Sequence, residues 1–163
     1  MDEISAYQMR RATWSFQREV SRTFLERNGT LGVNPAGAQC VNVPNSFWET
    51  FQLEAVPGDA WQFEGYEDAA RHYVPHINIG PYLVGDVLVF ARSSLYPLGH
   101  VAVVLDGSRG RLLTLSQNVP PGEPVHEVRF PRKLPVGLIR LRARGSLYQV
   151  QLPTLVGTGE SFT

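Results

Sequence analysis

The chain of 163 residues is 43% hydrophobic and 18% charged, which is typical of one globular domain and not of a disordered or fibrous chain. Its 15 basic and 15 acidic residues give a formal net charge of +0, so a broad basic surface for nucleic acid is not expected. One cysteine excludes an internal disulfide and a zinc cage of several thiolates. Because the sequence has no apolar run of about 18 residues and begins without a secretory signal pattern, we expect no membrane insertion.

The first predicted element is an amphipathic helix. Residues 2–27 contain neither Gly nor Pro, and large apolar side chains recur there at intervals of four: Phe16, Val20 and Phe24. The pair Asn28-Gly29 is typical of a helix end. The chain is therefore divided into an N-terminal helix over 1–28, a main domain over 29–144 and a C-terminal tail over 145–163.

A second predicted helix follows a loop rich in Gly, Pro and Asn over 29–39. It begins at Cys40 and ends near Leu53, provided that Pro44 lies in the first turn, where its missing N–H costs nothing. The cysteine then lies at or beside the helix N-terminus, where the helix dipole lowers a thiol pKa, and we expect such a lowered pKa here. The alternative is a small buried hydrophobic side chain.

The second half of the chain predicts strands. After turns and a short helical piece near 67–72, runs rich in Val and Leu alternate with turn residues, as in an antiparallel sheet. We expect five strands, over Asp86–Ala91, His100–Asp106, Arg111–Gln117, Val125–Phe130 and Val136–Leu141. Helices first and strands afterwards make the fold class α+β, with N-terminal helices packed on an antiparallel sheet of about five strands.

Three positions together indicate nucleophilic chemistry. His100 follows a glycine and opens a predicted strand, which suits a general base held by a sheet. Ser116 and Asn118 end the next strand, where either side chain could orient an imidazole paired with Cys40. Each has a structural alternative, since a polar run before Val-Pro-Pro also suits a strand leading into a turn. His72, His76 and His126 compete with His100 for this role, and we expect His72 and His76 to lie on the surface or in loops without a metal.

Four segments resemble the CHAP family, the cysteine, histidine-dependent amidohydrolases/peptidases of the papain-like superfamily. The nucleophile segment of that family is Gly-x-Gln-Cys followed by a hydrophobic residue and Asp or Asn. The family also has a Gly-Asp-hydrophobic strand, a Gly-His-Val-Ala strand and a Glu-x-Asn segment. The corresponding stretches here are Gly37–Asn42, Val84–Phe90, Gly99–Val104 and Ser116–Asn118, within a similar region over about Pro35 to Leu141.

The resemblance implies a papain-like CHAP catalytic domain over 29–144 that cleaves peptidoglycan, as an N-acetylmuramoyl-L-alanine amidase or an endopeptidase. Carried over by position, Cys40 is the nucleophile, His100 is the base and later the acid, and Asn118 orients the imidazole. Gln39 and the backbone N–H of Cys40 would stabilise the oxyanion. Ser116 stands where many members carry Glu, so we expect weaker stabilisation of the imidazolium and slower turnover.

Some family members bind calcium through an acidic loop ahead of the cysteine, but residues 31–38 contain no Asp or Glu. We therefore expect no calcium and no other metal or cofactor. Trp48 and Trp61 are predicted core residues, and the turn at Gly85-Asp86 is predicted to be structural.

The predicted partner is bacterial peptidoglycan, with no nucleic acid, and the predicted state is a monomer. The favoured context is a phage endolysin or virion-associated lysin, made in the host cytoplasm and acting on the wall after holin release or as part of the particle. The alternatives are a bacterial amidase effector and a catalytically weak CHAP-like structural protein of a phage particle.

Overall fold

The computed structural model describes residues 9–16, 18, 40–108, 110–119, 123 and 125–142. The predicted loop over 29–39, which includes Gln39, lies outside the described residues, as do most of the predicted N-terminal helix and the tail over 145–163. Of that helix, residues 9–16 and 18 are helical, and Phe16 is buried as its periodicity predicted.

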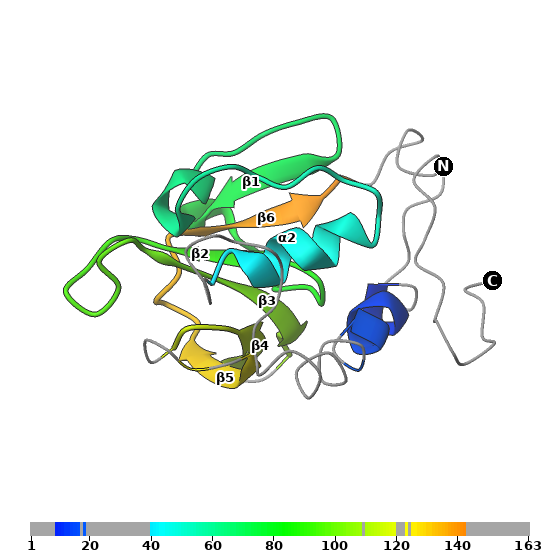
Figure 1. Ribbon diagram of the computed structural model, residues 1–163. Helices are drawn as coiled ribbons and strands as arrows, with labels where there is room; N and C mark the ends of the chain where they lie inside the picture. The colour runs from blue at the N-terminus through cyan, green and yellow to red at the C-terminus, as the bar shows by residue number, and fades with distance from the viewer. Residues whose placement is uncertain are drawn as a thin grey trace.

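Six antiparallel strands form one sheet, and helix α2 (Asn42–Glu49) lies across one face of it (Figure 1). The strands are β1 (Arg71–Pro75), β2 (Val87–Phe90), β3 (His100–Asp106), β4 (Arg111–Ser116), β5 (His126–Pro131) and β6 (Gly137–Leu141), in the spatial order β1-β6-β2-β3-β4-β5. Two short 3-10 helices, η1 (Ala60–Phe63) and η2 (His76–Asn78), lie in the connections. The predicted α+β class is confirmed, with one strand more than expected.

The additional strand is β1, and the helical piece predicted near 67–72 is wrong. Strand β1 pairs with β6 from Arg71 opposite Leu141 to Pro75 opposite Gly137, about 65 residues apart in the chain. Asp68 caps its start by accepting hydrogen bonds from the backbone N–H groups of Ala70 and Arg71. Pairing with a distant strand therefore overrides the local helical preference of this segment.

Helix α2 is shorter than predicted, but Pro44 does lie in its first turn. Its buried face includes Phe47 and Trp48, both with no exposed surface, and the Trp48 ring stacks on Phe63 with centroids 6.0 Å apart. Trp48 is therefore a core residue, as predicted. The helix ends at Glu49, and the hydroxyl of the C-cap residue Thr50 donates to the carbonyl of Phe47 at 2.6 Å.

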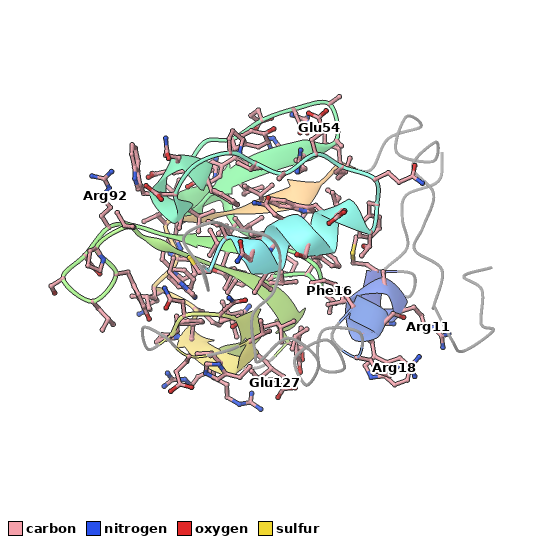
Figure 2. All side chains as sticks on the ribbon, viewed as in Figure 1. Arg11, Phe16, Arg18, Glu54, Arg92 and Glu127 are labelled. Atoms are coloured by element: carbon pink, nitrogen blue, oxygen red, sulfur yellow. The ribbon has the colours of Figure 1, made fainter. Side chains whose placement is uncertain are left out.

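Alternation along the strands gives the sheet two apolar faces, and side chains fill both of them (Figure 2). The face covered by α2 carries Val87, Val89, Val101, Val103, Leu115 and Ile139, which cluster with Cys40, Phe47 and Trp48. The opposite face carries Leu88, Phe90, Ala102, Val104, Leu112, Phe130 and Leu138, which pack with Tyr82 and Tyr96 from the loops. A residue's place in the alternation therefore decides which cluster its side chain joins.

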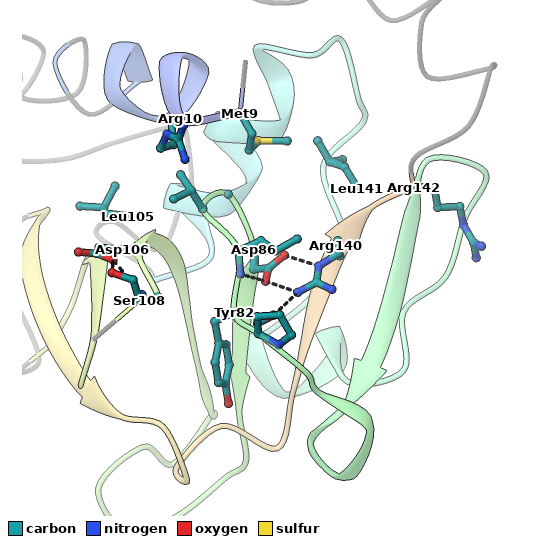
Figure 3. A pocket seen from close by; sticks show the side chains of 15 residues that line it. Met9, Arg10, Tyr82, Asp86, Leu105, Asp106, Ser108, Arg140, Leu141 and Arg142 are labelled. Atoms are coloured by element: carbon teal, nitrogen blue, oxygen red, sulfur yellow. Dashed lines mark hydrogen bonds and ion pairs between the residues drawn. The ribbon is translucent and has the colours of Figure 1, made fainter. Parts of the chain in front are cut away.

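The turn at Gly85 and Asp86 is structural, as predicted. Gly85 has φ of +90°, and the buried carboxylate of Asp86 accepts from Nε and Nη2 of Arg140 at 2.8 and 2.7 Å. The backbone N–H of Leu83 donates to the same carboxylate at 2.8 Å. This ion pair joins β2 to β6 beside a pocket of about 860 Å³ (Figure 3). The pocket lies where β2 begins and β3 ends, at the other end of these strands from His100.

Candidate active site

Cys40 lies beside the N-terminus of α2 as predicted, although the helix begins two residues later than expected, and its environment is apolar. The side chain is 8% exposed and belongs to the cluster on the α2 face. Burial raises the pKa of the Cys40 thiol to about 11, against the opposing effect of backbone N–H groups, first that of Val101. The charge of Asp59 raises the pKa further. The expected lowering of this pKa is therefore wrong, because desolvation outweighs the dipole of an eight-residue helix.

His100 opens β3 as predicted, and its ring is 1% exposed. The ring centroid lies 5.2 Å from that of Tyr96, at an interplanar angle of 21°, and 5.5 and 5.6 Å from those of Phe90 and Phe130. This apolar enclosure lowers the pKa of His100 to about 3 through desolvation. The resting imidazole is therefore neutral at neutral pH.

Ser116 lies directly beside the ring. Its Oγ is 3.4 Å from Nε2 of His100 and 3.1 Å from Oγ1 of Thr114, and Thr114 donates to the carbonyl of Val128 at 2.8 Å. All three polar side chains are buried. The structure thus brings together two of the predicted site residues, His100 and Ser116.

The thiol and the imidazole meet β3 from opposite faces of the sheet. His100 pairs with Phe90, and its ring packs against the aromatic side chains of that face, whereas Cys40 packs with the cluster under α2. The contact of the thiol with β3 is the backbone of Val101, the residue that follows His100. Within the described part of the chain, no hydrogen bond joins Cys40 to His100.

Asn118 lies just beyond the end of β4. It has φ of +66°, a left-handed conformation that Asn tolerates better than most residues, and its N–H donates to the carbonyl of Glu123 at 2.8 Å. Among the described residues, the hydrogen bond given by the His100 ring is the one with Ser116. The placement of Gln39 lies outside the described residues.

Gln117 is a residue that the sequence analysis did not single out. It has no exposed surface, and within the described structure neither Nε2 nor Oε1 of its side chain has a hydrogen-bond partner. Val103 pairs with Leu115, so the β3–β4 ladder continued by two residues sets Gln117 opposite Val101, on the α2 face. The sequence could have indicated its burial on the α2 face, because side chains alternate along a strand and Gln117 lies between Ser116 and Asn118.

The loop between β2 and β3 ties η1 to the start of β3. The backbone N–H of Trp61 donates to the carbonyl of Leu98 at 3.0 Å. Gly99 has φ of +76°, and a Cβ there would lie 2.8 Å from the carbonyl oxygen of Phe90 and 3.0 Å from the nitrogen of Trp61. The Trp61 ring itself is 38% exposed under the guanidinium of Arg92, 3.8 Å away, so its predicted core role is wrong. Figure 2 shows Arg92 at the edge of the molecule.

His72 and His76 lie away from this cluster, whereas His126 pairs with Ser116 at the start of β5. His72 is exposed on β1, with Nδ1 2.7 Å from a carboxylate oxygen of Glu67, a partner that the sequence analysis did not foresee. His76 begins η2 and is exposed. Among the described residues, no group of three or more His, Cys, Asp or Glu side chains could hold a metal ion. In the same part of the chain, no helix combines the length and apolar character needed to cross a membrane.

The family model for the CHAP domain matches residues 30–118, so the chain belongs to the CHAP domain family. The comparison with curated proteins gave no match. Among solved structures, the endolysin LysIME-EF1 is similar at 17% identity and a TM-score of 0.57, over 78% of this chain and 66% of that one. Ly7917 with the hydrolysing product of MDP is similar at 16% identity and a TM-score of 0.53, over 84% of this chain and 62% of that one. These structures share the fold of this chain, which spans about two thirds of their length or less.

Proposed function

We propose that the protein is a peptidoglycan hydrolase of endolysin type, in which Cys40 is the nucleophile and His100 the general base. Membership of the CHAP domain family and the shared fold with an endolysin support this class. The proposal rests on the contact of the Cys40 thiol with the backbone of Val101, the residue after His100, and on the Ser116 hydroxyl beside the His100 ring.

The resting pair consists of a neutral thiol and a neutral imidazole, since burial raises the pKa of Cys40 to about 11 and lowers that of His100 to about 3. The thiol proton is therefore transferred during the attack and not before it. Because Nε2 is held by Ser116, Nδ1 is the nitrogen that takes this proton. Because the two side chains lie on opposite faces at the start of β3, this transfer requires substrate binding to bring Nδ1 within about 3 Å of the thiol.

Attack of Cys40 Sγ on an amide carbonyl of the wall peptide forms a tetrahedral intermediate. The backbone N–H of Cys40 donates to its oxyanion, with Gln39 as the proposed second donor. The protonated Nδ1 of His100 then gives its proton to the leaving nitrogen, and the C–N bond breaks. Water, deprotonated by the same nitrogen, hydrolyses the resulting thioester and frees the thiol.

We propose Asn118 as a further polar group at the ring, with Ser116 standing where many family members have Glu. Without a carboxylate beside it, the imidazolium formed during the reaction is less stabilised, so slow turnover is expected. Neither metal nor cofactor enters this scheme.

Mass spectrometry of purified peptidoglycan digested by the wild-type protein and by Cys40→Ser tests the proposal and identifies the bond. Stem peptides freed from muramic acid define an amidase, and newly cut stems or cross-bridges define an endopeptidase. Either product is expected from the wild type and neither from the variant. A wild-type protein that yields no product from several wall chemotypes would favour instead a CHAP-like structural protein of a phage particle.

The proposed context is a phage lysin that reaches the wall after holin release or on the particle, acting as a monomer. A bacterial amidase effector would use the same residues. Neighbouring genes separate the two, since a holin accompanies the first and a secretion system with an immunity gene the second.

A further inference from the structure

The buried hydroxyls behind His100 form a chain in which each group has a single proton to give. Thr114 Oγ1 donates to the carbonyl oxygen of Val128 at 2.8 Å, and this carbonyl can only accept. A threonine hydroxyl carries one hydrogen, so Oγ1 of Thr114 must accept in its other contact, at 3.1 Å from Ser116 Oγ. The hydroxyl hydrogen of Ser116 is therefore directed at Thr114.

The same assignment of single hydrogens extends from Ser116 to the imidazole of His100. Because the only hydrogen of the Ser116 hydroxyl points toward Thr114, its oxygen can only accept from Nε2 of His100, at 3.4 Å. A neutral imidazole that donates from Nε2 has its unprotonated nitrogen at Nδ1. We propose that Thr114 is a positioning residue which, through Ser116, holds His100 in the Nε2–H tautomer and so leaves Nδ1 as the basic nitrogen.

Burial and apolar neighbours keep the direction of these hydrogen bonds fixed. Thr114 and Ser116 have no exposed surface, and His100 is 1% exposed, so water does not compete for these groups. The His100 ring is packed against the aromatic rings of Phe90, Tyr96 and Phe130. Within the described residues, the hydrogen bond of the ring is the one to Ser116. The acceptor that starts the chain is a backbone carbonyl of β5, which cannot reverse its role.

The direction of the hydroxyl hydrogen bonds fixes the tautomer of His100, which a carboxylate at position 116 would fix by its charge. A carboxylate beside Nε2 both fixes the tautomer and stabilises the imidazolium, whereas the hydroxyl chain does only the first. The catalytic consequence rests on the proposed function, but the tautomer is a property of the resting protein.

The test is the tautomer of His100 in the whole uniformly ¹⁵N-labelled chain at pH 7, read from long-range ¹H–¹⁵N correlation spectra. The ring signals are assigned by their loss in His100→Gln. In the wild type, Nε2 is expected to carry the proton and Nδ1 to show the downfield shift of an unprotonated nitrogen. A wild-type ring protonated at Nδ1 would overturn the proposal.

Thr114→Val keeps the shape of the side chain and removes the acceptor, so the Ser116 hydroxyl is free to donate to Nε2. The ratio of the Nε2–H to the Nδ1–H tautomer is expected to fall about fivefold or more, the equivalent of one ordinary hydrogen bond. Thr114→Ser, which keeps the hydroxyl, is expected to retain the wild-type ratio. An unchanged ratio in Thr114→Val would refute the role of Thr114.

If Thr114→Val fails to fold, Ser116→Ala gives the second reading, since loss of the Oγ acceptor should also lower the ratio. A wild-type ratio in that variant would equally refute the proposal. Peptidoglycan digestion is measured in parallel, and Thr114→Val is expected to lower kcat with little change in KM. A wild type with the expected tautomer but no digestion would contradict the proposed function while leaving the hydroxyl chain established.

Discussion

Cys40 and His100 approach the start of β3 from its two sides, the thiol at the backbone of Val101 and the imidazole at the hydroxyl of Ser116. Each side chain is buried in a separate apolar cluster, and burial keeps each of them neutral. The resting centre is therefore a desolvated acid and a desolvated base and not a preformed ion pair.

The Cys40 thiol is expected to react slowly with iodoacetamide. With a pKa of about 11 against an ordinary value of 9.0, its thiolate fraction at pH 8 is about 100-fold below that of an exposed cysteine. The alkylation rate measured against pH should have its midpoint near 11 in the folded protein. The urea-unfolded chain is the matched control, with a midpoint near 9. A folded-state midpoint at or below 9 would mean that an ion pair with His100 overcomes burial.

Burial of neutral His100 makes stability depend on pH. Its pKa is about 3 in the folded protein and 6.5 when exposed, so below pH 6.5 the unfolded chain binds a proton that the folded protein does not. The stabilisation is complete above pH 6.5 and is lost as the pH falls toward 3. At pH 4 the loss amounts to about 3 kcal/mol.

Urea unfolding of wild type and His100→Phe at pH 7 and pH 4 measures that loss. The fall in stability between the two pH values should be about 3 kcal/mol smaller in the variant, because the titrating group is gone. His76→Gln, at an exposed position, should keep the wild-type fall. Equal losses in the wild type and in His100→Phe would show that His100 is protonated as easily in the folded protein as in the unfolded chain.

A carboxylate at position 116 is expected to raise the pKa of His100, because a negative charge beside the ring favours the imidazolium. Ser116→Asp introduces this charge, and Ser116→Asn is the neutral control of the same shape. An NMR titration should give a higher His100 pKa in the Asp variant than in the Asn variant, together with faster peptidoglycan digestion at pH 7. A pKa equal in the two variants would place residue 116 out of contact with the ring.

The side-chain amide of Gln117, which has no hydrogen-bond partner among the described residues, is expected to cost stability. A buried donor or acceptor without a partner costs about 1–3 kcal/mol, so Gln117→Met, which has similar length and no polar group to satisfy, should raise the free energy of unfolding by about 1 kcal/mol. Urea unfolding measures the change. A stabilised variant that loses digestion activity would indicate that the amide has a partner in the substrate complex. A destabilised variant would contradict the unpartnered state itself.

The sequence predicted the strands whose own residues carry a clear apolar pattern, including β6, which pairs with β1 and β2 and not with its chain neighbour β5. The alternation of Val and Leu in the segments that form β2 to β6 is visible without any knowledge of the fold. Strand β1 was missed because it depends on β6, whose residues lie about 65 positions away. Its first residue, Arg71, is of a type usually found on the surface, but here it is buried, with Cζ of its guanidinium 4.8 Å from the centroid of the Trp48 ring.

The candidate site shows a similar division. The positions of Cys40 before a helix and of His100 at a strand start follow from local pattern, as does the closeness of Ser116 to His100 on the adjacent strand. The direction in which the pKa of the thiol shifts does not follow from local pattern, because it depends on how completely the cluster under α2 excludes water. Nor does the exposure of Trp61, since a short segment without clear periodicity gives no sign of which side chains it buries.

The most direct test of the account is the release of new amino groups from purified peptidoglycan, which either an amidase or an endopeptidase must produce. Wild type, Cys40→Ser, Cys40→Ala, His100→Gln and the control His76→Gln are compared at equal concentration after each is shown to fold. We expect release by wild type and His76→Gln, and a loss of at least about 100-fold in the other three. Amino groups released at the wild-type rate by either Cys40 variant would contradict the account.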